Sequence, residues 1–148
     1  MKDITQIVVP VDLAEHTEKI IAYAAAGAEK FSAKLHVVHV VELLPTLGEL
    51  ELGTTTMDSF NKKRMEQSKD FLHKFLLGYP ECIGKIVSGV IVDEITSYAK
   101  SVEADLIIIG THGTKGLEKL LLGSVAERVV KNAHCPTLVM NPYKQAAG

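Results

Sequence analysis

The sequence predicts an α/β fold with one doubly wound, five-stranded parallel sheet and helices on both faces. Short β-branched runs alternate along the chain with longer segments in which apolar residues recur at helical spacing. The short runs are apolar almost throughout, which is typical of strands buried on both faces of a sheet. The alternation of strand and helix indicates parallel strands joined by right-handed crossovers. We therefore expect a Rossmann-like sheet with the strand order 3-2-1-4-5.

The first half of the chain supplies two strands and two helices. Residues 4–11 and 35–41 are the first β-branched runs, with a helix expected between them over residues 17–32. The apolar side of this helix consists of Ile20, Ala24, Ala28 and Phe31. The longest helical pattern covers residues 57–77, where one side consists of Phe60, Arg64, Ser68, Leu72 and Phe75. Residues 43–56, with two glycines and a proline, are expected to form a loop.

The second half completes the alternation. Residues 83–90 are expected to form the third strand, and a helix follows over residues 93–102. Its apolar stripe consists of Ile91, Ile95, Tyr98 and Val102. The dense run at residues 105–109 is the fourth strand. A last helix over residues 124–132 and a last strand over residues 136–140 end the pattern.

Composition indicates one soluble, cytoplasmic domain over residues 1–148. The chain has 148 residues and a net charge of −2, without the basic stripe that nucleic-acid binding needs. We expect no secretory leader, because the first residues lack an apolar run and a small-residue cleavage site, and no membrane span, because no run of about 18 uncharged apolar residues is present. Cys82 and Cys135 lie far apart, with no metal-binding spacing, and are expected to be buried free thiols in a reducing compartment.

Two histidines in the second strand invite a metal-site interpretation, which their spacing disfavours. His36 and His39 are three residues apart, so their side chains are expected on opposite faces of the sheet. His134 and Cys135 are adjacent in sequence and are also expected to diverge. We therefore predict no metal site at either pair.

Topology names the candidate ligand loops before any motif is considered. In doubly wound sheets, ligands bind at the carboxyl ends of the strands, where the strand order switches. The candidate loops are therefore Pro10-Val11-Asp12 after the first strand, Val40-Val41-Glu42 after the second, and the segment from Gly110 onward after the fourth.

The segment from Gly110 to Ser124 is rich in glycine and leads into the last helix. Glycines at 110, 113, 116 and 123 allow backbone amides to approach an anion closely. Gly123 and Ser124 lie where the helix begins, and free amides and the helix dipole favour a phosphate there. Ser124 is expected either to cap the helix or to bind a phosphate oxygen. The alternative is an ordinary loop with turn glycines and a serine cap, because neither GxxxxGK[ST] nor GxGxxG is present.

The spacing Gly110-x2-Gly113-x9-Gly123-Ser124 resembles the G-x2-G-x9-G-[S/T] motif of nucleotide-binding universal stress proteins. The resemblance extends over nearly the whole chain. The runs IVVPVD, LHVVHVVE, ADLIIIGTHG and LLLGSVAERVVKNAHCPTLVM are similar to that family's first, second and fourth strands and its last helix and strand. The resemblance implies an ATP-binding domain.

The resemblance also implies roles for individual residues. Pro10, Val11 and Asp12 would contact adenosine, with Asp12 near the ribose or a metal-bound water, and the backbone of Val40 would contact adenine. The phosphate side would consist of Gly110, Thr111, His112, Gly113, Gly123, Ser124 and Val125. Mg²⁺ would accompany the triphosphate. From the residues alone, Asp12 could instead support the turn or cap the first helix, and no residue is predicted to be catalytic.

Three functions remain open at this point. The first is an ATP-binding stress or regulatory protein with at most slow hydrolysis, and the preference among ATP, ADP and AMP is open. The second is an ATPase or phosphotransferase, although positioned cations and a group that orients the nucleophile are not evident. The third is a structural dimer that binds no nucleotide.

The last strand is expected at a sheet edge, and an exposed apolar edge favours a covering partner. Family members commonly pair through this strand, so the resemblance implies a homodimer through Pro136 to Met140.

Overall fold

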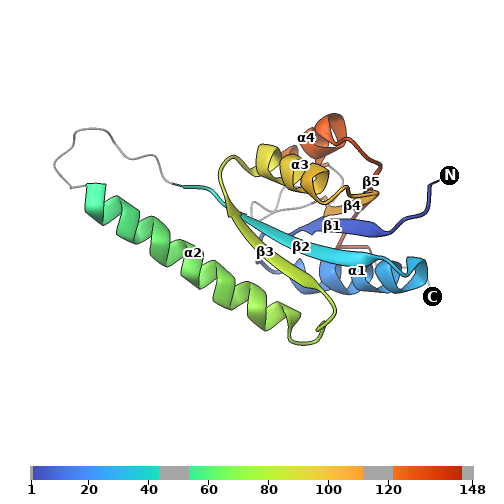
Figure 1. The fold of residues 1–148 in the computed structure, drawn as a ribbon, viewed down its shortest axis with the longest axis horizontal. Coiled ribbons are helices and arrows are strands. Elements are labelled where there is room, and N and C mark those ends of the chain that lie inside the picture. The colour runs from blue at the N-terminus through green and yellow to red at the C-terminus, as the bar shows by residue number, and fades with distance from the viewer. Residues whose placement is uncertain (1, 44–53, 112–121, 145–148) are drawn as a thin grey trace.

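The computed structural model describes residues 2–43, 54–111 and 122–144 of the chain. The elements alternate along these residues in the predicted order (Figure 1). They are β1 (Gln6–Pro10), α1 (Thr17–Phe31), β2 (Lys34–Val41), α2 (Thr54–Leu76), β3 (Ile83–Ser88), α3 (Ile91–Ser101), β4 (Leu106–Gly110), α4 (Ser124–Asn132) and β5 (Thr137–Met140).

The strands form one parallel sheet in the order β3-β2-β1-β4-β5, which confirms the predicted fold. Alternate residues of the central strands enter two separate cores. Ile7, Val9 and Val37 pack against α1 and the end of α2, whereas Val8 and Val38 pack against α3 and α4. Figure 1 shows these helix pairs on opposite faces of the sheet. The doubly wound architecture therefore follows from apolar side chains on both sides of each inner strand.

Several element ends differ from the predicted ones, and for α1 and β3 the conformation of a single residue explains the difference. Ser32 adopts a left-handed conformation with φ 55° and ends α1 one residue early. Gly89 has φ 147°, so β3 ends at Ser88 and not at residue 90. α2 begins at Thr54, within the segment predicted to be a loop, and the rest of that predicted loop, residues 44–53, lies outside the described residues.

Two aromatic residues of the predicted helix sides are about half exposed. Phe31 is the last residue of α1, and Phe60 lies in the first half of α2. Figure 1 shows this half of α2 extending past the sheet. Of the described residues of α2, Leu72 is the fully buried one. The thiols of Cys82 and Cys135, predicted to be buried, are free and half-buried, and partial burial raises the pKa of both.

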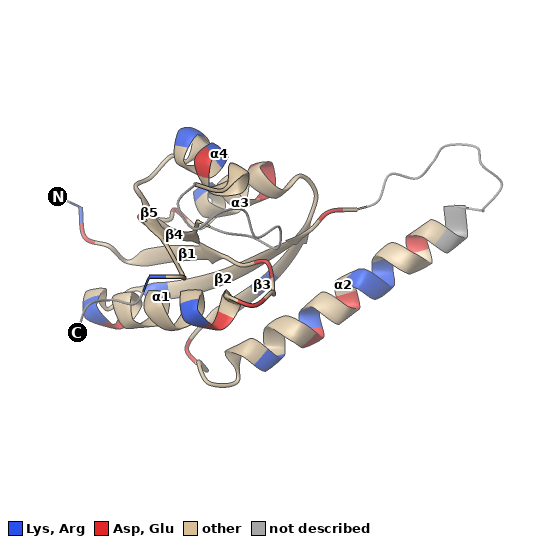
Figure 2. Cartoon of the chain, turned by 180° about the vertical axis from the view of Figure 1, so that it is seen from behind, with Lys and Arg blue, Asp and Glu red and all other residues tan. Residues whose placement is uncertain are grey.

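Charged residues of both signs are spread along the described elements, including the length of α2 (Figure 2). The basic run of α2 is divided between two roles, since Lys62 and Lys63 are exposed while Arg64 donates to the carbonyl of Glu42. None of the helices among the described residues is long and apolar enough to cross a membrane.

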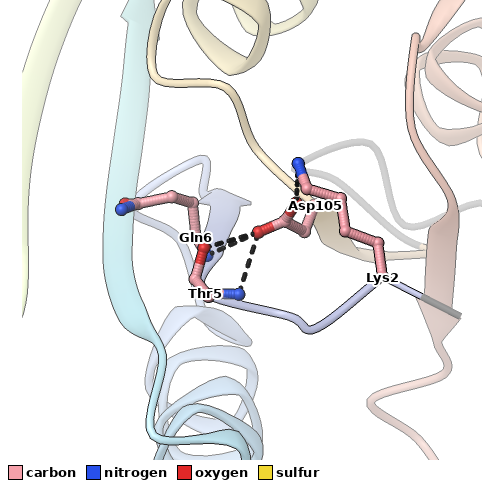
Figure 3. Close-up of polar contacts among 4 residues, drawn as sticks. All are labelled: Lys2, Thr5, Gln6 and Asp105. Atoms are coloured by element: carbon pink, nitrogen blue, oxygen red, sulfur yellow. Dashed lines mark hydrogen bonds and ion pairs between the residues drawn. The ribbon is translucent and has the colours of Figure 1, made fainter.

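The amino edge of the sheet is held by Asp105, which directly precedes β4. Its Oδ2 accepts the amides of Thr5 and Gln6 at 2.8 and 3.1 Å and the Thr5 hydroxyl at 2.9 Å (Figure 3). Its Oδ1 lies 2.8 Å from the Nζ of Lys2. This cluster joins the starts of β1 and β4, so the two central strands are fixed together at the end opposite the candidate ligand loops.

Candidate functional site

The candidate site lies at the carboxyl edge of the sheet, where β1 and β4 are neighbours. The chain runs outward from β1 through β2 to β3 on one side, and from β4 to β5 on the other. The strand order therefore reverses between β1 and β4, and the loops after these strands leave in opposite directions. The first of the predicted loops follows Pro10, and the glycine-rich segment follows Gly110, so the topology brings these two predicted segments to the same edge.

Val11 is the first residue after β1, and both of its backbone polar groups are bonded to β2. Its amide donates to the carbonyl of Val38 at 2.8 Å. Its carbonyl oxygen lies 2.8 Å from Nδ1 of His39, which therefore carries the proton and donates it. The side chain of Val11 is buried in the core beneath α1. The start of this loop is thus tied to β2 by one backbone bond and one imidazole.

Asp12 forms a tight turn that leads into α1. Its Oδ1 accepts the amide of Ala14 at 3.0 Å and the hydroxyl of Thr17 at 3.3 Å. Leu13 between them has φ 61°, a conformation that this side-chain turn stabilises. The interpretation of Asp12 as a turn residue is therefore correct, while the cap position of α1 is occupied by His16. Among the described residues, no hydrogen bond is formed by the Oδ2 of Asp12.

The glycine-rich segment is closed by backbone hydrogen bonds at its base. The amide of Thr111 donates to Met140 of β5 at 2.9 Å, and the amide of Gly123 donates to the Thr111 carbonyl at 2.8 Å. His112 and Gly113, predicted to border the phosphates, lie outside the described residues. The bond between Gly123 and Thr111 brings the start of α4 back to the end of β4.

Position 123 requires glycine because no side chain fits there, and not because of its backbone dihedral angles. Its φ of −62° suits any residue, but a Cβ there would overlap the carbonyl oxygen of Thr111. Side-chain atoms do not approach backbone oxygen so closely, so a larger residue would have to break or shift the closing hydrogen bond. From the sequence, the glycines are expected to allow backbone amides to approach an anion closely. In the structure, the group that Gly123 approaches is the carbonyl of Thr111.

The first backbone amides of α4 lie beside this closure and have no helical hydrogen-bond partner. Gly123 occupies the cap position, and the first helical bond runs from the Glu127 amide to the Gly123 carbonyl at 2.9 Å. The expectation that Ser124 caps the helix is wrong, because Ser124 is already the first helical residue and is exposed. The amides of Ser124, Val125 and Ala126 precede the helical hydrogen-bond ladder and carry the positive end of the helix dipole.

Val40 lies near the carboxyl end of β2, and its side chain is buried in the core under α3. Its backbone is the part that can border the carboxyl edge. The orientation of that backbone follows from its neighbours. The carbonyl of Val38 faces β1, since it accepts from Val11, whereas the carbonyl of Val41 accepts from Gly89 beyond β3. Because backbone groups alternate along a strand, the amide and carbonyl of Val40 face the β1 side, beyond the end of β1.

The histidines of β2 point to opposite faces, as predicted. His36 is buried on the α3 side, where its Nε2 lies 2.9 Å from the Gln6 Oε1 and its Nδ1 lies 3.0 Å from the Tyr98 hydroxyl. The pKa of His36 is lowered mainly by burial and also by the positive charge of Lys34. His39 instead bonds Val11, a role that sequence reasoning missed. The only sequence signal was a polar residue near the end of an apolar strand. Among the described residues, no three metal-binding side chains lie together.

An open hollow of about 500 Å³ lies away from these loops, between α1 and α2. Its lining residues are Glu18, Phe71, Lys74, Phe75, Gly78 and Tyr79. None of them belongs to the predicted ligand loops, so the hollow is a feature separate from the candidate site.

Comparison with solved structures finds the same fold in universal stress proteins. One from Lactobacillus plantarum has a TM-score of 0.80 and 24% identity, covering 95% of this chain and 99% of that one. A universal stress protein from Archaeoglobus fulgidus, solved in complex with dAMP, has a TM-score of 0.54 and 22% identity over 93% of this chain and 98% of its own. Another universal stress protein, solved in complex with cAMP, has a TM-score of 0.62 and 20% identity, covering 95% of this chain and 99% of its own.

Sequence comparison identifies the family itself. A universal stress protein of Methanocaldococcus jannaschii is 38% identical over 144 residues, which are 95% of this chain and 84% of the relative. One of Thermus aquaticus is 31% identical over 136 residues, or 90% of this chain and 96% of the relative. The model of the universal stress protein family matches residues 4–141. The chain therefore belongs to the universal stress protein family.

Proposed function

We propose that this protein is a stress-response regulator that binds ATP with Mg²⁺ at the carboxyl ends of β1, β2 and β4. The observation that carries the proposal is the hydrogen bond between Gly123 and Thr111, which holds the start of α4 at the end of β4, on the same edge of the sheet as Asp12. Amides at a helix start favour phosphate, and glycine at 123 allows the backbone to close tightly. Two universal stress proteins of the same fold were solved with the adenine nucleotides cAMP and dAMP, which supports this choice of ligand.

The proposed ligand would lie across the switch point, with its two ends on different loops. Adenine would meet Val40, whose amide and carbonyl form a donor and an acceptor beyond the end of β1. Adenine offers an acceptor at N1 and a donor at N6, a pattern that such a backbone pair matches and that guanine reverses. Asp12 would contact the ribose or the metal, together with Pro10 and Val11. The phosphates would meet Ser124, Val125 and the glycines.

The residues present fit a magnesium ion that arrives with the nucleotide. Mg²⁺ commonly takes one or two carboxylates, phosphate oxygens and several waters. Asp12 uses Oδ1 in its turn and has Oδ2 left for such a site. The ion would neutralise phosphate charge, while the residues of this chain would orient the nucleotide.

We propose that the binding of the nucleotide, and not its hydrolysis, is the regulatory signal. Fast phosphoryl transfer needs a residue that orients the attacking group and cations placed at the transferred phosphate. The proposal assigns no residue to these roles. We also propose that residues 1–148 act as one nucleotide-binding domain in the cytoplasm, a compartment that suits the free thiols of Cys82 and Cys135.

Mass spectrometry of small molecules released from freshly purified protein tests the proposal, together with calorimetric titration with Mg·ATP. We expect an adenine nucleotide in the released fraction and saturable binding in the titration. Absence of nucleotide together with no thermal shift at millimolar ATP would instead favour a structural protein. Phosphate release of many turnovers per minute would favour an enzyme.

The substitution Gly123→Ala is expected to weaken ATP binding at least tenfold, or about 1.4 kcal/mol. The added Cβ meets the Thr111 carbonyl and disturbs the closure that positions the α4 amides. Gly78→Ala is the matched control, because a Cβ at Gly78 meets nothing within 4 Å. Calorimetric Kd values measure both variants, and equal affinity of Gly123→Ala and wild type would contradict the assigned site.

We further propose a homodimer formed through the edge strand β5. The strand order leaves β5 with a neighbour on one side, β4, and its side chains are half-buried. A strand edge that ends in unpaired backbone groups is a template for another strand. Pairing of two β5 strands across a twofold axis would satisfy both edges at once.

A further inference from the structure

We propose that His39 is a positioning residue that keeps the backbone amide of Val40 available to the nucleobase. The inference rests on the proposed adenine site at Val40, and it assigns the residue that makes this site possible. The last backbone hydrogen bond between the β1 segment and β2 is the one from the Val11 amide to the Val38 carbonyl.

A regular parallel ladder would use the amide of Val40 at this point. In such a ladder, a residue whose amide donates to one partner accepts, at its carbonyl, from the partner two residues farther along. The amide of Val11 donates to Val38, so its carbonyl would be expected to accept from Val40. Among the described residues, that bond is not formed.

The imidazole of His39 takes the place of this bond. Its Nδ1 lies 2.8 Å from the carbonyl oxygen of Val11, a distance typical of an N–H donor. His39 and Val11 lie on the same side of the sheet, toward α1 and α2, whereas Val40 packs its side chain on the other side. The imidazole thus satisfies the Val11 carbonyl from the α1 face of the sheet, and the backbone pairing of β1 and β2 ends before it reaches Val40.

Two consequences follow for the candidate site. The amide of Val40 keeps its direction toward β1 but is released from the sheet, and it becomes a donor for a ligand. The chain after Val11 is also free to leave β2 and enter the turn in which Asp12 binds the amide of Ala14 and the hydroxyl of Thr17. A single side chain therefore arranges both the base end and the ribose end of the proposed site.

The variant His39→Leu removes the donor and keeps an apolar side chain of similar reach. Without it, the Val11 carbonyl is expected to accept from Val40 and to extend the ladder, which sequesters the amide that would bind adenine. His39→Asn is the matched control, because its amide nitrogen is bonded to Cγ just as Nδ1 is. We expect Mg·ATP affinity to fall at least tenfold in His39→Leu and to return to within about threefold of wild type in His39→Asn.

Hydrogen exchange of the Val40 amide, followed by NMR on the ligand-free protein, tests the inference without any nucleotide. A loss of ordinary structural support would speed exchange in His39→Leu, whereas an extended ladder slows it. We expect rapid exchange in wild type and His39→Asn, and at least tenfold slower exchange in His39→Leu. A protected Val40 amide in the wild-type protein would overturn the inference even if the leucine variant failed to fold.

The two readouts separate this inference from the proposed function. Slower exchange of Val40 in His39→Leu, combined with no binding of ATP to the wild-type protein, would support the role of His39 and refute the ATP site. Binding of ATP to the wild-type protein, combined with unchanged affinity and unchanged exchange in His39→Leu, would refute the role of His39 alone.

Discussion

Asp105 gives the clearest electrostatic contribution of a single residue in this protein. The Lys2 ammonium, and then the amide and hydroxyl of Thr5, hold the pKa of this carboxyl well below its usual range. A folded-state pKa below the unfolded value of about 3.9 contributes stability that is fully present above that value. This contribution is lost as the pH falls through the lower folded-state pKa. Asp105 therefore stabilises the fold at neutral pH and loses this effect in acid.

Asp105→Asn is expected to lower the melting temperature most at pH 7, and the loss should decrease progressively as the pH falls below about 4 toward the low folded-state pKa. The amide cannot accept the same set of charge-assisted hydrogen bonds, so the amino ends of β1 and β4 lose their common anchor. Glu66→Gln is the control, since its ion pair with Lys69 is 3.5 Å long and joins two exposed side chains. Thermal unfolding at several pH values between 7 and 2 measures the trend, and a loss that does not shrink toward pH 2 would disagree with the assigned cause.

At the scale of elements, the segment after β5 acts as a cover for the start of α1. Pro142 is fully buried, and its carbonyl accepts from Lys19 at 3.3 Å. The ring of Tyr143 meets His16 edge-on, with 4.6 Å between ring centres. His16 directly precedes Thr17, which bonds Asp12, so this cover stabilises the helix start on which the candidate site depends.

Pro142→Ala is expected to cost about 2 kcal/mol of unfolding free energy. The change removes roughly two buried methylene groups and the restriction that proline places on the unfolded chain. Urea denaturation measures the shift in midpoint, with Lys144→Ala as the control at an exposed neighbouring position. A loss below roughly 0.5 kcal/mol would show that the segment contributes little to the packing.

Element types were predictable from sequence because the runs at β1, β2 and β4 are apolar on both faces, whereas element ends depended on single conformations. Ser32 takes a left-handed angle that the sequence pattern assigns to glycine, so the helix appeared to continue through it. The spacing predicted a close backbone approach at Gly123, and the structure shows such an approach to Thr111, while the ligand roles of the site residues stay predictions. The hydrogen bond between His39 and Val11 was not predictable from the sequence. It joins residues 28 positions apart, and it depends on the residue at which the pairing of β1 and β2 ends.

At the scale of the whole molecule, the edge strand β5 links the proposed dimer to the candidate site. The carbonyls of Pro136 and Met140 accept from β4 and from Thr111, so alternate residues of β5 face inward. Thr137 and Val139 must then direct their backbone groups to the open side. The strand that supports the base of the glycine-rich segment is thus the one that would pair with a second copy.

Val139→Pro should therefore give a folded monomer. Proline removes the outward amide of Val139 without touching the bonds to β4, and edge strands tolerate proline at such positions. Its apolar ring can still pack on the core that Val139 contacts. Light scattering at micromolar concentration is expected to show half the wild-type mass, with circular dichroism unchanged. A dimer that persists in this variant would move the interface away from β5, whereas a wild-type monomer would refute the dimer itself.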